Sequence, residues 1–249
     1  MEKEEFLLSC FEKIGVTLNK RQACQFLKYY DMLIEWNNMF NLTSITEYEE
    51  VCIKHFVDSC SLVFSYNGFE KTNEFLSDKS LVDVGSGAGF PGIPLKILFP
   101  ELSITLIDSL DKRVKFLNAV IDALELEKIS AVELMIKVLE ETDEPVTIVS
   151  TGPLTNAARA VAALPVLCEY CLPFVKVGGH FIALKSEKAN EEINISSHAL
   201  SVLGGEVSNI SSFVLPDNVS SRSIIDISKV ASTPMTYPRK AGTPSKKPL

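Results

Sequence analysis

The chain has 249 residues, of which 46% are hydrophobic and 22% charged, and its formal net charge at pH 7 is −8. These values are ordinary for a soluble globular enzyme, and the length fits one large α/β domain or one domain with a helical cap. The acidic balance excludes general nucleic-acid binding, so any RNA contact would need a local basic cluster. Two such clusters are present: Lys112, Arg113 and Lys115, and then Arg239, Lys240, Lys246 and Lys247.

The compartment can be inferred from segments that the sequence lacks. No apolar run is long enough to cross a bilayer, and the acidic start has no basic region or cleavage site of a signal peptide. The six cysteines lie mostly in apolar periodic segments, which favours reduced, buried thiols over a disulfide framework. Cys168 and Cys171 have neither a second C-x-x-C pair nor a nearby histidine pair, so we expect no metal site. We therefore expect a cytoplasmic protein.

Residues 1–77 are predicted to form an N-terminal helical cap. Thr17 is expected to cap a long helix, and Thr46 with Glu49 forms a capping box before a second helix. The polar run 67–79 is predicted to be the connection to the next domain. The apolar faces of the two helices carry Phe26, Leu27, Tyr30, Leu33 and Ile34, and then Val51, Phe56, Leu62 and Val63.

From residue 78 to 249 the pattern alternates between strands and helices, which is typical of a parallel sheet. It predicts an α/β fold with a doubly wound, mostly parallel sheet, and an extended tail from Pro234. The predicted strands are Leu81–Val84, Ser103–Asp108, Val146–Ser150, His180–Lys185, Ile210–Leu215 and Ser223–Ser228. The predicted helices are Pro94–Leu98, Asp111–Leu124, Glu133–Glu140 and one within Asn156–Tyr170.

A glycine-rich turn follows the first predicted strand, in the stretch LVDVGSGAGFPGIPL at 81–95. Gly85, Gly87 and Gly89 allow backbone conformations that other residues avoid, and they let the backbone come close to a ligand. The two prolines that follow suit the first turn of a helix, whose bare amides can hold a polar or anionic group. The spacing differs from the dinucleotide fingerprint G-x-G-x-x-G. The alternative interpretation is a tight turn with no ligand.

Asp108 ends the second predicted strand, about 20 residues past the glycine turn, where a doubly wound fold places a carboxylate for ribose hydroxyls. Because ligands collect at the carboxyl ends of the strands, the turn and Asp108 should face one crevice. Alternatively, Asp108 caps the helix that follows, which Ser109 or Asp111 could do equally well. No G-K-[ST] lysine follows the glycines, and this argues against a nucleoside triphosphate.

The motifs VDVGSGAGFPGIPL and LIDSLDKRVKFL resemble the bacterial 16S ribosomal RNA guanine-N7 methyltransferases, also called the glucose-inhibited division protein B family. WNNMFNLTSI at 36–45 and His55-x-x-Asp58-Ser59 also fit, as do LPVLCEYCLPFVKVGGHFIALK at 164–185 and YPRKAGTPSKKPL at 237–249. The resemblance implies a Rossmann-like methyltransferase that uses S-adenosylmethionine. It also implies that the protein acts on small-subunit ribosomal RNA or the 30S subunit, and we expect it to be a monomer.

The resemblance further implies roles for individual residues. The implied cofactor-binding residues are Asp83, Gly85, Ser86, Gly87, Gly89, Phe90, Asp108 and Ser109. Arg159 would lie nearest to the cofactor and the target base as the catalytic candidate. The implied RNA-binding residues are His55, Arg222, Tyr237, Arg239 and Lys240. Each RNA-binding role has a structural alternative: His55 as a packing residue, Arg222 as a hairpin cap, and the basic tail as a solvated segment.

Residues 133–158 depart from the family pattern. The expected G-R-A-E motif is absent, and only Arg159-Ala160-Val161-Ala162 fits the family at the end of this stretch. EPVTIVSTGPLTNAARA at 144–160 is instead similar to a strand–loop–helix of inosine–uridine nucleoside hydrolases, in which the turn lies beside a calcium ion and a nucleoside. Three hypotheses result: an active RNA methyltransferase, a folded but inactive chimera, and a nucleoside hydrolase. The hydrolase would need a calcium-binding aspartate run that this chain lacks.

Overall fold

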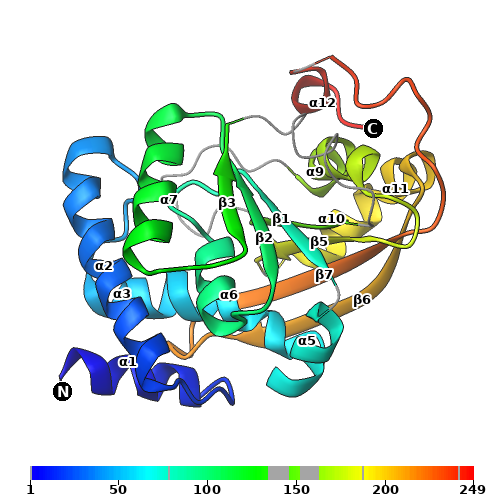
Figure 1. The fold of residues 1–249 in the computed structure, drawn as a ribbon. Coiled ribbons are helices and arrows are strands. Elements are labelled where there is room, and N and C mark those ends of the chain that lie inside the picture. Colours follow the sequence, from blue (N-terminus) through cyan, green and yellow to red (C-terminus); the bar gives the residue numbers. More distant parts are fainter. Residues whose placement is uncertain (1, 78, 134–145, 152–162, 187, 241) are drawn as a thin grey trace.

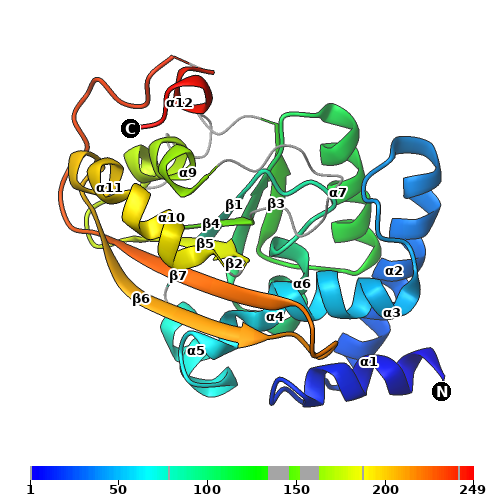
Figure 2. The same cartoon turned by 180° about the vertical axis from the view of Figure 1, so that it is seen from behind.

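The computed structural model describes residues 2–77, 79–133, 146–151, 163–186, 188–240 and 242–249, with the backbone alone for 146–151. Helices cover both faces of one central sheet, and the N-terminal helices gather on one side of it (Figures 1 and 2). Within the described residues, none of the helices is both long and apolar enough to cross a membrane.

Seven strands form the sheet in the order β3-β2-β1-β4-β5-β7-β6. The strands are β1 (Ser80–Val84), β2 (Ser103–Ile107), β3 (Ile129–Val132), β4 (Val146–Thr151), β5 (His180–Lys185), β6 (Gly205–Val214) and β7 (Ser221–Lys229). Strands β1 to β5 pair in parallel, and β7 pairs antiparallel with both β5 and β6. The predicted α/β fold with a doubly wound, mostly parallel sheet is confirmed.

Each predicted strand is present, and the bounds follow from burial. Central β1 is buried from Leu81 to Asp83, as expected for a strand covered on both faces, whereas edge strand β6 alternates between half-buried and exposed residues. The alternation extends β6 five residues before the predicted start at Ile210, to Gly205. Strand β3 is absent from the prediction because its four residues, ISAV, carry no long apolar run.

The helices before the sheet are α1 (Lys3–Glu12), α2 (Lys20–Phe40), α3 (Tyr48–Val51), the π-helix η1 (Cys52–Val57), α4 (Asp58–Cys60), the 3₁₀ helix η2 (Ser61–Phe64) and α5 (Phe69–Leu76). Those within and after it are α6 (Gly92–Leu98), α7 (Asp111–Ala123), α9 (Leu164–Cys171), the 3₁₀ helix η3 (Leu172–Phe174), α10 (Ala189–Ile195), α11 (Ser197–Leu203) and α12 (Thr243–Lys246). Helices α5, α10, α11 and α12 were not predicted, so the run 67–79 is not a plain connection and the tail is not wholly extended.

Both predicted helix caps in the N-terminal region are wrong. Asn19, not Thr17, caps α2: its side chain accepts from the amide of Gln22, and the Gln22 side chain accepts from the amide of Asn19. This reciprocal box satisfies two amides that the helix leaves free, so the helix begins there. Helix α3 begins after Glu47, which makes no side-chain cap, so Thr46 and Glu49 form no box.

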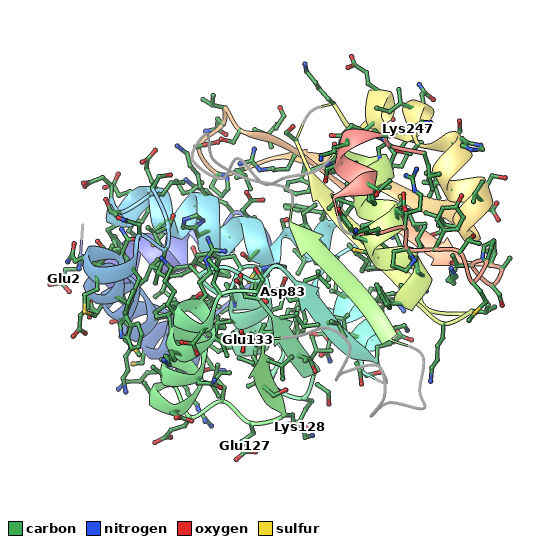
Figure 3. All side chains as sticks on the ribbon, turned by 90° about the horizontal axis from the view of Figure 1, so that it is seen from above. Glu2, Asp83, Glu127, Lys128, Glu133 and Lys247 are labelled. Atoms are coloured by element: carbon green, nitrogen blue, oxygen red, sulfur yellow. The ribbon has the colours of Figure 1, made fainter. Side chains whose placement is uncertain are left out.

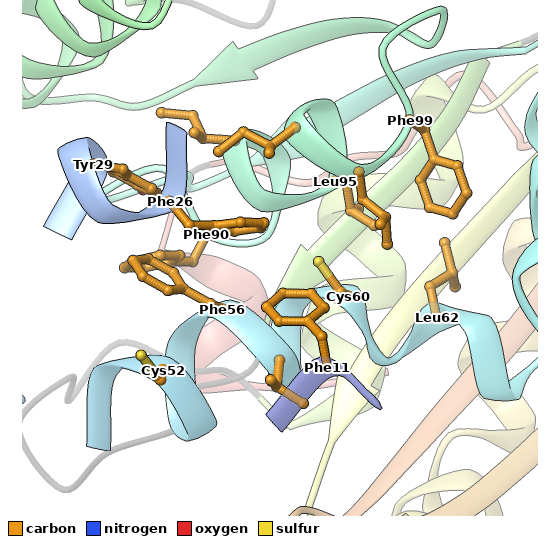
Figure 4. Close-up of a cluster of buried hydrophobic side chains, with 14 of the residues drawn as sticks. Phe11, Phe26, Tyr29, Cys52, Phe56, Cys60, Leu62, Phe90, Leu95 and Phe99 are labelled. Atoms are coloured by element: carbon orange, nitrogen blue, oxygen red, sulfur yellow. The ribbon is translucent and has the colours of Figure 1, made fainter. Parts of the chain in front are cut away.

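The cap and the sheet share a single apolar core. Phe26 of α2 packs against Phe56 of η1, with ring centroids 5.0 Å apart, and Tyr29 packs against Phe90 of the glycine-rich turn at 5.6 Å (Figure 4). Phe116 of α7 joins the same buried cluster. A second cluster lies under α9 and α11. All six cysteines are free thiols, and only Cys24 is exposed.

Candidate functional site

Among the described residues, almost nothing packs against the first two glycines of the turn between β1 and α6, whereas the third faces packed protein. All three have positive φ: +79° at Gly85, +58° at Gly87 and +94° at Gly89. A Cβ atom at Gly85 would meet no described atom within 4 Å, and one at Gly87 would meet only the Gly85 carbonyl, at 3.8 Å. A Cβ atom at Gly89 would lie 2.5 Å from Ile93 and 2.7 Å from the Tyr29 hydroxyl. A ligand can therefore approach the backbone of the first two glycines.

Several amides of the turn are already used inside the protein. The amides of Gly85 and Ser86 both donate to the Ile107 carbonyl, at 2.8 and 3.0 Å, and those of Gly89 and Phe90 donate to the Ser86 carbonyl. The Ser86 hydroxyl accepts from the Ile107 amide at 3.1 Å and donates to the Asp83 carbonyl at 3.0 Å. The expectation that this turn presents bare amides to a ligand is therefore wrong at these four amides. Those of Gly85 and Ser86 connect the turn to β2, and those of Gly89 and Phe90 close the turn on itself.

Asp83 lies beneath the turn and has no exposed surface. Its Oδ2 accepts from the Gly92 amide at 3.1 Å and so holds the start of α6. Its Oδ1 is buried without a hydrogen-bond partner among the described residues. Burial raises the pKa of this carboxyl to about 8, despite the hydrogen bond from the Gly92 amide. The geometry makes Asp83 an orienting group for the turn rather than a solvent-facing one.

Asp108 lies at the end of β2 with its carboxylate against the turn. Oδ2 accepts from the Gly87 amide at 2.9 Å and from Arg113 Nη1 at 3.3 Å, and Oδ1 accepts from the Leu110 amide at 3.0 Å. The side chain is 2% exposed, whereas neighbouring Ser109 is exposed. The structure thus brings Asp108 and the turn together at the carboxyl ends of two neighbouring strands, where open α/β sheets bind ligands.

His55 lies under the turn, not on the surface. Its ring stacks on Phe90, with centroids 4.4 Å apart and an angle of 14° between the planes. Nε2 lies 2.9 Å from the Thr43 hydroxyl, and Nδ1 is buried without a partner among the described residues. Burial lowers the pKa of His55 to about 4, so the ring is neutral at pH 7. His55 therefore joins the cap to the turn, as the packing alternative for this residue expected.

Arg222, at the start of β7, is held in a buried ion pair. Its Nε donates to Oδ2 of Asp58 at 2.8 Å, and the two side chains are 11% and 1% exposed. Burial raises the pKa of Asp58 to about 6, and the adjacent guanidinium only partly opposes this shift. Arg222 connects the hairpin to α4, and in this geometry its Nε is not available to RNA.

The predicted RNA-binding residues of the tail differ in exposure. Arg239 is bound to Glu169 of α9, with Nε 2.7 Å from Oε1 and Nη2 2.5 Å from Oε2. Burial of Glu169 raises its pKa, but the hydrogen bonds and charge of Arg239 outweigh burial and hold it below the usual value. Tyr237 is half-buried against the second apolar cluster, and Lys240 is exposed.

Part of the predicted site lies outside the described residues. This applies to Arg159, to almost all of the predicted helix Glu133–Glu140 and to the start of the helix within Asn156–Tyr170. Strand β4 of the atypical segment is described, and its backbone pairs with β1 and β5.

Three residues at the site were not predicted. Arg113 binds Asp108, Glu169 binds Arg239, and the Tyr29 hydroxyl donates to the Ala88 carbonyl within the turn. Arg113 belongs to a basic cluster in the sequence, and this was its only signal. Tyr29 and Glu169 lie on helices remote in sequence from their partners, and their own segments carry no signal for these contacts.

Neither a candidate metal group nor the surface pocket near α5 adds a residue to this site in the part of the chain that the structure describes. Within the described ranges, no group of three or more His, Cys, Asp or Glu side chains could hold a metal ion. A surface pocket of about 450 Å³ lies between the α1–α2 loop and the start of α5, and it contains none of the predicted site residues.

Comparison with known proteins gives consistent matches. The family model described as GidB, rRNA small subunit methyltransferase G, matches residues 22–225. Proteins called ribosomal RNA small subunit methyltransferase G are similar over their full length. The one from Staphylococcus carnosus is 47% identical over 249 residues, 98% of each chain, and the one from Bacillus subtilis is 46% identical over 252 residues, 100% of this chain and 99% of the relative. The matches do not support a nucleoside hydrolase origin for 133–158.

Solved structures resemble this chain in fold. A crystal structure of a mutant of MtNAS has a TM-score of 0.52 at 10% identity, covering 92% of this chain and 86% of that one. M. jannaschii TYW2 in complex with AdoMet has a TM-score of 0.48 at 12% identity, covering 71% and 77%.

Proposed function

This chain belongs to the rRNA small subunit methyltransferase G family, and from that membership we propose that it transfers a methyl group from S-adenosylmethionine to guanine N7 of small-subunit ribosomal RNA. The observation that carries the proposal is a full-length match at 46% to 47% identity, joined to a glycine turn whose first two glycines face open space. We also propose that the protein is a cytoplasmic monomer.

The residues at the turn fit a nucleoside that carries an amino acid. Gly85 and Gly87 have no side chains and face free space, so their backbone can lie against the ligand. Asp108 stands beside them with oxygens that accept hydrogen bonds, and ribose hydroxyls are donors that suit them. Exposed Ser109 adds a hydroxyl at the same edge. We propose these four residues as the cofactor-binding groups, with Asp83, Ser86, Gly89 and Phe90 holding the turn in shape.

The methyl transfer requires few catalytic side chains. S-adenosylmethionine, when bound, supplies an electrophilic methyl group on a sulfonium. Guanine N7 has an in-plane lone pair and loses no proton when it attacks, so the site needs no general base. The protein's contribution is to align the base with the methyl group, to exclude water and to provide fixed dipoles. Arg159 remains the candidate for contact with the target base. Its replacement by alanine should lower kcat while the affinity for S-adenosylhomocysteine is retained.

The assignment of the cofactor site can be tested by calorimetry with S-adenosylhomocysteine. Asp108→Ala removes the predicted ribose partner and should weaken binding at least tenfold, or about 1.4 kcal/mol. Asp111→Ala is the matched control, because this carboxylate lies three residues away, is exposed and pairs with Lys115, and it should leave the affinity unchanged. Equal affinities for wild type and Asp108→Ala would remove Asp108 from the site.

The reaction itself is tested by mass spectrometry of small-subunit ribosomal RNA after incubation with S-adenosylmethionine. We expect N7-methylguanosine at one position. A chain that binds S-adenosylhomocysteine but transfers no methyl group would instead support the inactive alternative for the segment 133–158. Calcium-dependent cleavage of a nucleoside would support the hydrolase, which the absence of a candidate metal group among the described residues disfavours.

A further inference from the structure

The C-terminal tail is a basic region on an acidic protein. The stretch from Ala231 to Leu249 carries four basic residues and no acidic residue, whereas the whole chain has a net charge of −8. RNA binding is driven largely by cationic groups that neutralise phosphates, and a net negative protein must concentrate such groups in one place. The tail concentrates cationic groups in this way.

The lysines of the tail have no acidic partner among the described residues, unlike several exposed lysines elsewhere in the chain. Lys71 is paired with Glu74, and Lys128 is paired with Glu101. In contrast, no ion pair joins Lys240, Lys246 or Lys247 to any described residue, and all three are exposed. Their charges are therefore free to act on a partner.

The tail is also fixed in place. Glu169 has no exposed side-chain surface and binds Arg239 through both oxygens, and Oε1 also accepts from the Arg239 amide at 3.0 Å. Arg239 in turn donates to the Lys247 carbonyl at 2.9 Å, which closes the tail on itself. A bidentate arginine–carboxylate pair of this kind is strong and fixes orientation. The lysines are thus presented on an ordered segment.

The tail lies at the end of the molecule where the site lies. Helix α12 is at the top of Figures 1 and 2, the end towards which β3 points. Figure 3 looks onto this end and shows Asp83 near the centre and Lys247 to one side, on α12. A polyanion that reaches the turn from this side would meet the tail.

We propose that the tail is a preorganised docking surface for the ribosomal RNA backbone, in which Lys240, Lys246 and Lys247 contact phosphates and the Glu169–Arg239 pair holds them in position. The choice of ribosomal RNA as the partner of the tail rests on the proposed function. It also changes the role of Arg239 from an RNA ligand to a positioning residue, because its guanidinium is already bound to Glu169 and the Lys247 carbonyl.

The first test replaces the three lysines by alanine and measures binding to protein-free small-subunit ribosomal RNA at several salt concentrations. We expect the affinity to fall at least tenfold and the slope of log K against log salt to decrease by about 2 to 3. The control replaces Lys13, Lys20 and Lys71, which are exposed in the N-terminal helical region, and should keep the wild-type slope. A tail variant with wild-type affinity and slope would overturn the proposal.

The second test separates the positioning role from direct contact. Glu169→Gln keeps all lysines but weakens the hold on Arg239, and should raise the KM for RNA several-fold at unchanged kcat. Arg239→Lys keeps the charge without the bidentate geometry and should give the same result. If Arg239 bound phosphate directly, Arg239→Lys would be mild and Glu169→Gln neutral. That pattern would overturn the positioning role.

Affinity for S-adenosylhomocysteine, measured on every variant, shows that each remains folded. It also distinguishes the two proposals. A wild-type chain that binds RNA through the tail but transfers no methyl group would refute the proposed function alone. Methyl transfer and RNA binding that are both insensitive to the three lysines would refute the tail surface alone.

Discussion

Three buried ionisable residues, Asp83 and His55 at the glycine turn and Asp58 in α4, have pKa values shifted in different directions. Burial raises the pKa of Asp83 to about 8 and that of Asp58 to about 6, while it lowers the pKa of His55 to about 4. In each case burial penalises the charged form. The protein therefore keeps this region largely free of unpaired charge, and the stability of the fold depends on pH through these residues.

His55 gives the first prediction at this scale. Its pKa is about 4 in the folded chain and about 6.5 when unfolded, so the unfolded state binds more protons between these values. The stabilising effect of a neutral His55 is present above pH 6.5 and is lost as the pH falls towards 4. Wild type should therefore lose up to about 3 kcal/mol relative to His55→Gln between pH 7 and pH 4, measured by urea unfolding.

The choice of variant isolates this residue. The carboxyls of Asp58 and Asp83 titrate in an overlapping range in both proteins and therefore cancel in the difference. Glu50 and Lys54, the charged neighbours that influence His55, are also the same in both. If the unfolding free energies of wild type and His55→Gln run parallel with pH, the ring is not buried as the structure shows.

At the scale of elements, Gln22 connects two helices that are far apart in sequence. Its side chain closes the capping box of α2, and its Nε2 also donates to the carbonyls of Ile97 and Leu98 at 3.1 and 3.2 Å. Those carbonyls belong to the last turn of α6, where a helix leaves its acceptors without partners. One buried side chain thus holds the start of α2 and the end of α6.

Replacing Gln22 by alanine should therefore be costly. We expect Gln22→Ala to lower the free energy of unfolding by about 2 to 3 kcal/mol, because a cap is lost and buried carbonyls lose their donor. Gln25→Ala is the matched control on the same helix, since its amide makes one hydrogen bond, to the Leu124 carbonyl. The control should cost about 1 kcal/mol. Equal losses in urea unfolding for the two variants would contradict this role of Gln22.

These elements also show what the sequence could predict. Strand β1 and the glycine turn have a local pattern of apolar residues and glycines, and both were predicted from it. The contacts that shape the site are not local: His55 meets Phe90, and Tyr29 meets Ala88, across 35 and 59 positions. Periodicity identifies a buried face but not the surface that it meets. For that reason the cap helices were predicted, whereas their contacts with the glycine turn were not.

The residues that we propose for cofactor binding could be selected from the sequence for the same reason. Gly85, Gly87 and Asp108 are set by their positions at strand ends, which follow from the fold class. The family resemblance implied that Arg222 and Arg239 bind RNA, and a sequence does not show which carboxylate pairs with a basic residue. Each has a buried carboxylate from a distant helix, Asp58 or Glu169. Charge counts cannot distinguish an exposed cation from one that is already paired.

At the scale of the whole molecule, we propose a cap at 1–77 and a methyltransferase domain at 78–249. The two parts share one apolar core. One cluster of buried side chains joins α1, α2 and η1 to α6 and α7. Two units that share a core expose apolar surface when separated, so neither is expected to fold independently. We therefore expect the cap and the sheet to unfold as one unit.

Trp36, the single tryptophan of the chain, can report on this shared core. It lies on α2, and its ring centroid is 5.5 Å from that of Phe116 on α7. If the chain is one cooperative unit, urea unfolding followed by tryptophan fluorescence and by far-UV circular dichroism should give the same midpoint and slope. Phe116→Leu, which removes ring contacts from the interface, should lower both midpoints together. A fluorescence transition that precedes the loss of secondary structure would show instead that the cap unfolds by itself.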